Sequence, residues 1–103
     1  MSYLILHEKI QMYNYLVEFV GTILLAYVVL ATNNPLSIGL AYAFILLLTK
    51  DLTSGYMNPA IAIMMAATDK ITVSELIPYC IVQVIGALAA YQIFITYKIG
   101  VTS

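Results

Sequence analysis

The sequence has little of what most enzymes and nucleic-acid-binding proteins use. It contains no tryptophan and no arginine, a single histidine and a single cysteine, and only 9% of its 103 residues are charged. One cysteine, Cys80, permits neither an internal disulfide nor a cysteine-rich metal site. The net charge of −1 offers no basic surface to nucleic acid. We find no nucleophile–base pair, metal-ligand cluster or phosphate-binding loop, so we expect no enzyme, cofactor or metal.

Apolar residues dominate the chain. They are 63% of the chain, and the mean hydropathy is +0.98, which indicates an integral, multi-pass membrane protein of the all-α class in an unspecified membrane. We expect one membrane domain over residues 1–103, with transmembrane helices at 12–32, 35–50 and 73–98. Residues 1–14 are expected to form a mixed polar tail without a signal-peptide pattern, so the first helix is taken as retained.

The segment between the second and third spans carries the strongest local signals. Asn58 is a good N-cap and Pro59 suits the first helical position, while Thr68-Asp69-Lys70 ends the apolar run. A helix from Pro59 to Ala67 is roughly 14 Å long, about half of a hydrocarbon core. We therefore expect a re-entrant loop at 51–57 and a half-helix at 58–68. Thr72 and Glu75 have capping-box spacing and open the third span.

Four segments in order resemble the aquaporin and aquaglyceroporin family of major intrinsic proteins (MIP). They are VEFVGT at 17–22, PLSIGL at 35–40, TSGYMNPA at 53–60 and YxxxQxxGA at 79–87. Members of that family have six spans and two Asn-Pro-Ala half-helices arranged as an inverted repeat. The resemblance covers one such repeat, so it implies three transmembrane helices plus one re-entrant half-helix, which is half of an aquaporin fold.

The resemblance also implies roles for particular residues. Glu18 and Gln83 would hold the re-entrant loop in shape. The residues expected to face the pore or solute are Asn58, Pro59, Ala60, Gly55, Tyr56, Ile38, Leu46 and Ile61. The plainer alternatives are that Asn58 is only an N-cap, that Glu18 lies at the membrane interface, and that Gln83 makes an ordinary bond between helices.

The sequence departs from the family pattern after Asn-Pro-Ala. The second repeat of family members carries an arginine there, at the narrow filter, whereas this chain continues with Ile61-Ala62-Ile63. With Ile38 and Leu46 at the other expected filter positions, the constriction would be apolar. The resemblance then implies a channel for water and/or small neutral solutes such as glycerol, and the missing arginine puts proton and cation rejection in doubt.

One repeat is too small to enclose a pore alone, so a second repeat is needed. We expect two copies to pair antiparallel in the lipid bilayer as a homodimer, and the resemblance implies that four such dimers could cluster. Lysines permit dual insertion, since Lys9, Lys50 and Lys70 fall on one membrane face and Lys98 on the other, a weak bias of three against one. A different interpretation stays open: a non-conducting or heteromeric half-channel subunit that needs another MIP-type partner.

Overall fold

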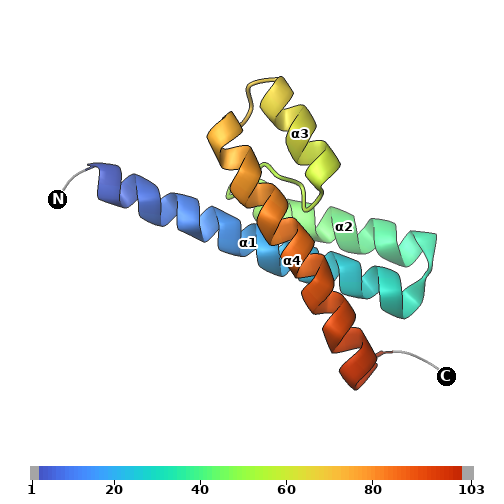
Figure 1. Ribbon diagram of the computed structural model, residues 1–103. Helices are drawn as coiled ribbons and strands as arrows, with labels where there is room; N and C mark the ends of the chain where they lie inside the picture. The colour runs from blue at the N-terminus through green and yellow to red at the C-terminus, as the bar shows by residue number, and fades with distance from the viewer. Residues whose placement is uncertain (1–2, 101–103) are drawn as a thin grey trace.

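The computed structural model describes residues 3–100, and this part of the chain forms four α-helices and no strand. Helix α1 spans Tyr3–Thr32, α2 spans Pro35–Thr49, α3 spans Pro59–Ala67 and α4 spans Val73–Tyr97. Figure 1 shows α1 and α4 crossing, α2 folded back beside the second half of α1, and α3 beside the first half of α4. The fold is elongated, with extents of 53 × 27 × 21 Å.

Residues 3–14, expected to form a mixed polar tail, are helical and continuous with the predicted first span. Helix α1 begins at Tyr3 and continues for 30 residues without a break. Residues 3–14 contain no glycine or proline, and leucine, glutamate, lysine, glutamine and methionine are strong helix formers. The polar Gln11 is also used, because its Nε2 donates to Glu75 Oε2 at 3.1 Å on α4. Scattered polar residues therefore lie on a helical face and do not interrupt the helix.

The crossing of α1 and α4 depends on a glycine. A Cβ on Gly86 would lie 3.0 Å from Thr22 Cβ and 3.1 Å from the Phe19 carbonyl oxygen, so a side chain here would push the two helices slightly apart. Small residues at crossing points are typical of helices that pack closely inside membranes. The close approach matters for the site, because it brings Glu18 on α1 next to Gln83 on α4.

Helix boundaries follow the capping signals in the sequence. Asn34 and Asn58 are the N-caps of α2 and α3, and a proline follows each at the start of its helix. Thr72 and Glu75 form the expected capping box at the start of α4. These three predicted helix starts are confirmed. Helix α3 is held against α4 through the buried Ala62.

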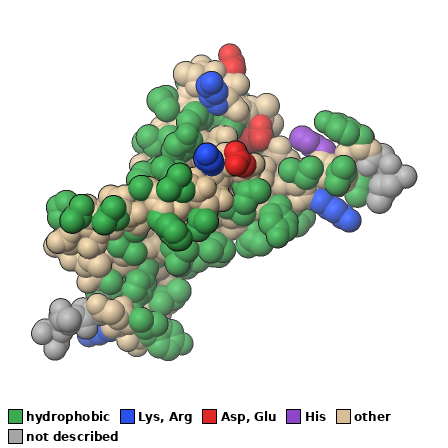
Figure 2. Space-filling view, turned by 180° about the vertical axis from the view of Figure 1, so that it is seen from behind, with side chains coloured by type: hydrophobic (Ala, Val, Ile, Leu, Met, Phe, Trp, Pro, Cys, Tyr) green, Lys and Arg blue, Asp and Glu red, His purple; other side chains and the backbone are tan. Residues whose placement is uncertain are grey.

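Two of the described helices, α1 and α4, are long and apolar enough to cross a membrane. Helix α2 is apolar but has only 15 residues, so its role as a third span stays a prediction. Figure 2 shows apolar side chains spread over the viewed face with few charged ones among them. Large apolar side chains such as Leu36 and Val73 are 72% and 70% exposed. Apolar exposure of this extent suits lipid or a partner helix.

Candidate functional site

The site is built on the loop that joins α2 to α3. Two consecutive residues of this loop, Tyr56 and Met57, have left-handed backbones with φ of 58° and 56°. Such a conformation is uncommon outside glycine, and each instance costs about 1–3 kcal/mol, so the surroundings have to hold it in place. Contacts from α1, α2 and α4 do so.

The strongest contact comes from Glu18 on α1, whose side chain is fully buried. Its Oε1 accepts from the backbone N–H of Met57 at 2.6 Å, and its Oε2 accepts from Thr53 Oγ1 at 2.7 Å. A third donor, Gln83 Nε2 on α4, reaches Oε1 at 2.8 Å. All three partners donate, which matches the acceptor-only chemistry of a carboxylate. The carboxylate therefore ties the loop to both long helices.

Gln83 adds a second tie, because its Nε2 also donates to the carbonyl oxygen of Gly55 at 3.2 Å. The same carbonyl accepts from the backbone N–H of Asn58 at 3.4 Å. Gly55 itself has no room for a side chain, since a Cβ there would lie 2.4 Å from Glu18 Oε1 and 2.9 Å from Gln83 Nε2. Both contacts of the carbonyl lie within the chain, and its place at a solute filter stays a prediction.

Sequence reasoning did not single out Tyr42, which completes the support of the loop. Its hydroxyl donates to the carbonyl oxygen of Tyr56, the first of the two left-handed residues. Ile38 and Leu46 lie four positions before and after it, so all three share one face of α2. Both are half-buried, as is Tyr56. The sequence signal that could have identified Tyr42 is its spacing of four residues from each of two expected filter positions.

Asn58 is placed at the exposed N-terminal end of α3. Its Oδ1 accepts from the backbone N–H of Ala60 at 2.9 Å, and the residue is exposed. Since Oδ1 makes the capping bond and the residue is exposed, the Nδ2 amide remains available as a donor. Pro59 and Ile61 are half-buried in the first turn, and Ala60 is exposed. The predicted contacts of these residues with a solute are untested.

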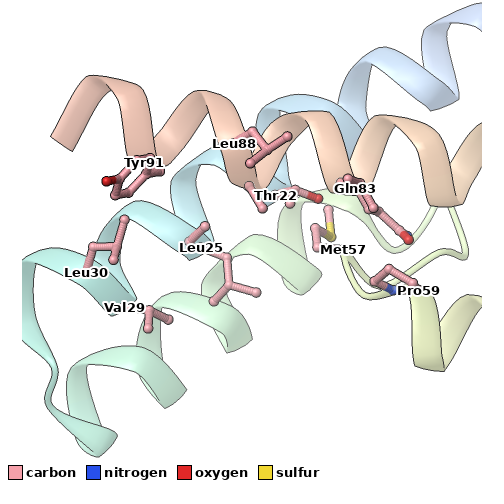
Figure 3. Close-up of a pocket in the computed structure, with 12 residues that line it drawn as sticks. Thr22, Leu25, Val29, Leu30, Met57, Pro59, Gln83, Leu88 and Tyr91 are labelled. Atoms are coloured by element: carbon pink, nitrogen blue, oxygen red, sulfur yellow. The ribbon is translucent and has the colours of Figure 1, made fainter. Parts of the chain in front are cut away.

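An apolar groove of about 540 Å³ lies beside this end of α3, between the second halves of α1 and α4. Figure 3 shows Leu25, Val29 and Leu30 along one wall and Leu88 and Tyr91 along the other. Met57, Pro59 and Gln83 close the groove at the loop (Figure 3). The groove was not foreseen from the sequence, because it depends on the crossing angle of the two helices.

The chain is similar to the glycerol uptake facilitator protein-like 6 of Lactiplantibacillus plantarum (strain ATCC BAA-793 / NCIMB 8826 / WCFS1). The two are 34% identical over 88 residues, which cover 77% of this chain and 41% of the relative. The chain thus spans about two fifths of the length of that protein. No family model and no solved structure matches the chain. The likeness supports the resemblance to the MIP family that the motifs indicated.

Proposed function

We propose that this chain is a MIP-type half-channel that passes water and/or small neutral solutes such as glycerol. The observation that carries the proposal is the half-helix α3, which starts at an exposed Asn58 and is held by a buried carboxylate. A helix N-terminus bears a partial positive charge, and an outward amide donates to a solute oxygen. This combination suits a neutral, oxygen-bearing solute and disfavours a cation.

The proposed pore is shared by two antiparallel copies, each of which contributes one half-helix. A self-complementary contact of this kind is closed, because the same surface serves on both copies. The match to about two fifths of a glycerol uptake facilitator-like protein agrees with one unit of a two-unit design. Two half-helices whose N-termini meet would orient water in opposite senses and repel cations.

The solute preference is proposed from the apolar character of Ile38, Leu46 and Ile61. These side chains offer no donors or acceptors, so a passing molecule finds its polar partners at Asn58 and on the loop backbone. An apolar constriction disfavours strict selection of water and favours molecules with a carbon skeleton and hydroxyl groups. Glycerol is the representative of that class.

The test is to reconstitute this chain alone into liposomes and to follow light scattering in stopped flow. An impermeant osmolyte reports water flow, and a glycerol gradient reports glycerol flow. Asn58→Asp keeps the capping oxygen but removes the amide donor and adds a negative charge at the proposed midpoint. We expect flow through the original chain and its loss in this variant.

The chain supplies a matched control for that variant. Asn34 is also followed by proline, and its Oδ1 also caps a helix, accepting from Ser37 N–H at 3.0 Å. It lies in the exposed turn between α1 and α2, so Asn34→Asp should leave flow unchanged. If folded chain alone gives no flow above empty liposomes, the homodimeric pore is wrong. The alternative, a non-conducting or heteromeric half that needs another MIP-type partner, would then replace it.

A further inference from the structure

A polar pocket lies where the first half of α1 meets the start of α4, apart from the loop and its supports. Its volume is about 290 Å³, and it is lined by His7, Gln11, Tyr15, Thr72, Ser74 and Glu75. Polar side chains are scarce in this chain, yet six of them meet here. The three from α1 follow one another at intervals of four residues, so they share one face of that helix.

The carboxylate of Glu75 is the charged group of this pocket. Its Oε1 accepts from the Thr72 backbone N–H at 3.0 Å and from Thr72 Oγ1 at 2.9 Å. Its Oε2 accepts from Gln11 Nε2 at 3.1 Å. A carboxylate oxygen carries two lone pairs, so Oε2 can accept a second hydrogen bond. His7 lies one helical turn before Gln11 in the same pocket, and its imidazole is the titratable donor on that side.

The groups around His7 suit a positively charged imidazole. Glu75 faces the pocket from α4, and Tyr15 lines it from α1. Tyr3 stacks on the imidazole with ring centroids 6.0 Å apart and an interplanar angle of 16°, and an aromatic face attracts a cation. The charged sequence neighbours Glu8 and Lys9 have opposite signs and do not line the pocket. An imidazolium here would therefore meet one carboxylate, and no lysine among the described residues that line the pocket.

We propose that His7 and Glu75 form a pH-sensitive contact that fastens the first turns of α1 to the start of α4 in mildly acidic surroundings. A histidine side chain gains its charge as the pH falls through about 6.5, and a glutamate keeps its charge down to about pH 4.3. Between these values an imidazolium and a carboxylate attract each other. The attraction is lost as the pH rises and the imidazole becomes neutral.

The contact acts on a segment that has little other cover. Residues 3–10 of α1 are all exposed, and Gln11 is the first part-buried side chain along the described helix. Figure 1 shows this end of α1 projecting beyond the other helices. At the inner edge of the pocket, Tyr15 packs edge-on against Tyr79 at 5.2 Å, and Tyr79 is buried with Ala62 of α3. Fastening His7 therefore steadies α1 next to the packing that supports α3.

Amide hydrogen exchange of residues 3–10 in detergent, at about pH 5.5 and about pH 7.5, measures the contact directly once intrinsic rates are corrected for. An exposed ion pair changes a local equilibrium by a modest factor, so we expect protection roughly 1.5- to 5-fold higher at the acidic pH. His7→Gln and Glu75→Gln should each abolish the difference, and glutamine at position 75 still suits the capping box. Glu8→Gln is the matched control, since it removes a carboxylate beside His7 but outside the pocket, and it should keep the difference.

His7→Lys gives an independent measurement, because a lysine keeps its charge at both pH values. We expect it to show the higher protection at both, while far-UV circular dichroism confirms that each variant keeps its helices. Equal protection of the original chain at the two pH values would overturn the proposal. So would a difference that survives in folded His7→Gln or Glu75→Gln, or low protection of His7→Lys at both pH values.

These outcomes are separate from those for the proposed function. Both residues belong to one copy, and hydrogen exchange in detergent requires neither a pore nor a second copy. A chain that gives no flow in liposomes but shows the pH difference would retain the contact and lose the half-channel. Flow without any pH difference would do the reverse.

Discussion

The carboxylate of Glu18 accepts a hydrogen bond from the backbone N–H of Met57 at 2.6 Å, although the two residues lie 39 positions apart. Met57 is the second of two left-handed residues that lie just before α3 and its N-cap Asn58. One buried side chain on α1 therefore fixes the strained turn that aims Asn58. The loop is therefore held by hydrogen bonds to the Glu18 carboxylate rather than by apolar packing alone.

Removing that carboxylate should unfold the loop. Glu18→Ala leaves three buried donors without an acceptor, and each costs about 1–3 kcal/mol. We expect a clear fall in the midpoint of thermal unfolding in detergent and loss of flow. Glu8→Ala, at an exposed position of the same helix, is the control and should change neither. A stable, conducting Glu18→Ala protein would contradict the role given to the carboxylate.

Adding a single methyl group at Gly55 should destabilise the protein. Its Cβ would lie 2.4 Å from Glu18 Oε1, where neither the carboxylate nor the loop can move without losing hydrogen bonds. We expect Gly55→Ala to destabilise the protein by about 1–3 kcal/mol. At Gly39 on α2 an added Cβ meets nothing within 4 Å. Gly39→Ala should be neutral or stabilising by up to about 1 kcal/mol, and equal effects at the two sites would refute this account.

Tyr42→Phe removes one oxygen and tests the third support of the loop. The Tyr56 carbonyl loses its donor, so we expect a destabilisation of about 0.5–1.5 kcal/mol. Reduced flow should accompany it, because the left-handed turn becomes less populated. Tyr97→Phe, at a position 68% exposed near the end of α4, is the control. Thermal unfolding and stopped flow on the same samples measure both effects.

For the capping box of α4 we predict an effect on stability alone. Thr72 Oγ1 accepts from Glu75 N–H at 3.1 Å, and Glu75 Oε1 accepts from Thr72 N–H at 3.0 Å. Thr72→Ala removes the first of these bonds and should cost about 1 kcal/mol. Thr96→Ala, exposed at the other end of α4, should cost less. If both substitutions shift the unfolding midpoint equally, the cap contributes nothing specific.

Local chemistry made much of the fold predictable. Asn58 with Pro59, and Thr72 with Glu75, fix helix starts through nearby hydrogen bonds, and these were readable directly from the sequence. The start of α1 was not readable, because His7 and Gln11 look like tail residues until Glu75 on α4 is placed beside them. The role of such polar residues becomes clear only when their hydrogen-bond partners, which are distant in sequence, are known.

The candidate site was likewise predictable only in part. A buried Glu18 in an apolar helix needs donors, and family resemblance pointed to the loop as their source. The Tyr42 contact and the unpartnered Gln83 oxygen depend on how α2 and α4 are rotated, and no sequence periodicity fixes that rotation. The predicted solute contacts of Asn58, Ile38 and Leu46 depend on the proposed pairing of two copies, so they remain predictions.

The central claim is that copies of this chain insert in both directions and pair. Its most direct test is a single cysteine at Asn33, in the exposed turn between α1 and α2, in a Cys80→Ser background. Cells that express this variant are treated with a membrane-impermeant maleimide before and after permeabilisation. We predict one population labelled at once and a second labelled only after permeabilisation. Labelling of every copy from one side alone would contradict the antiparallel pore.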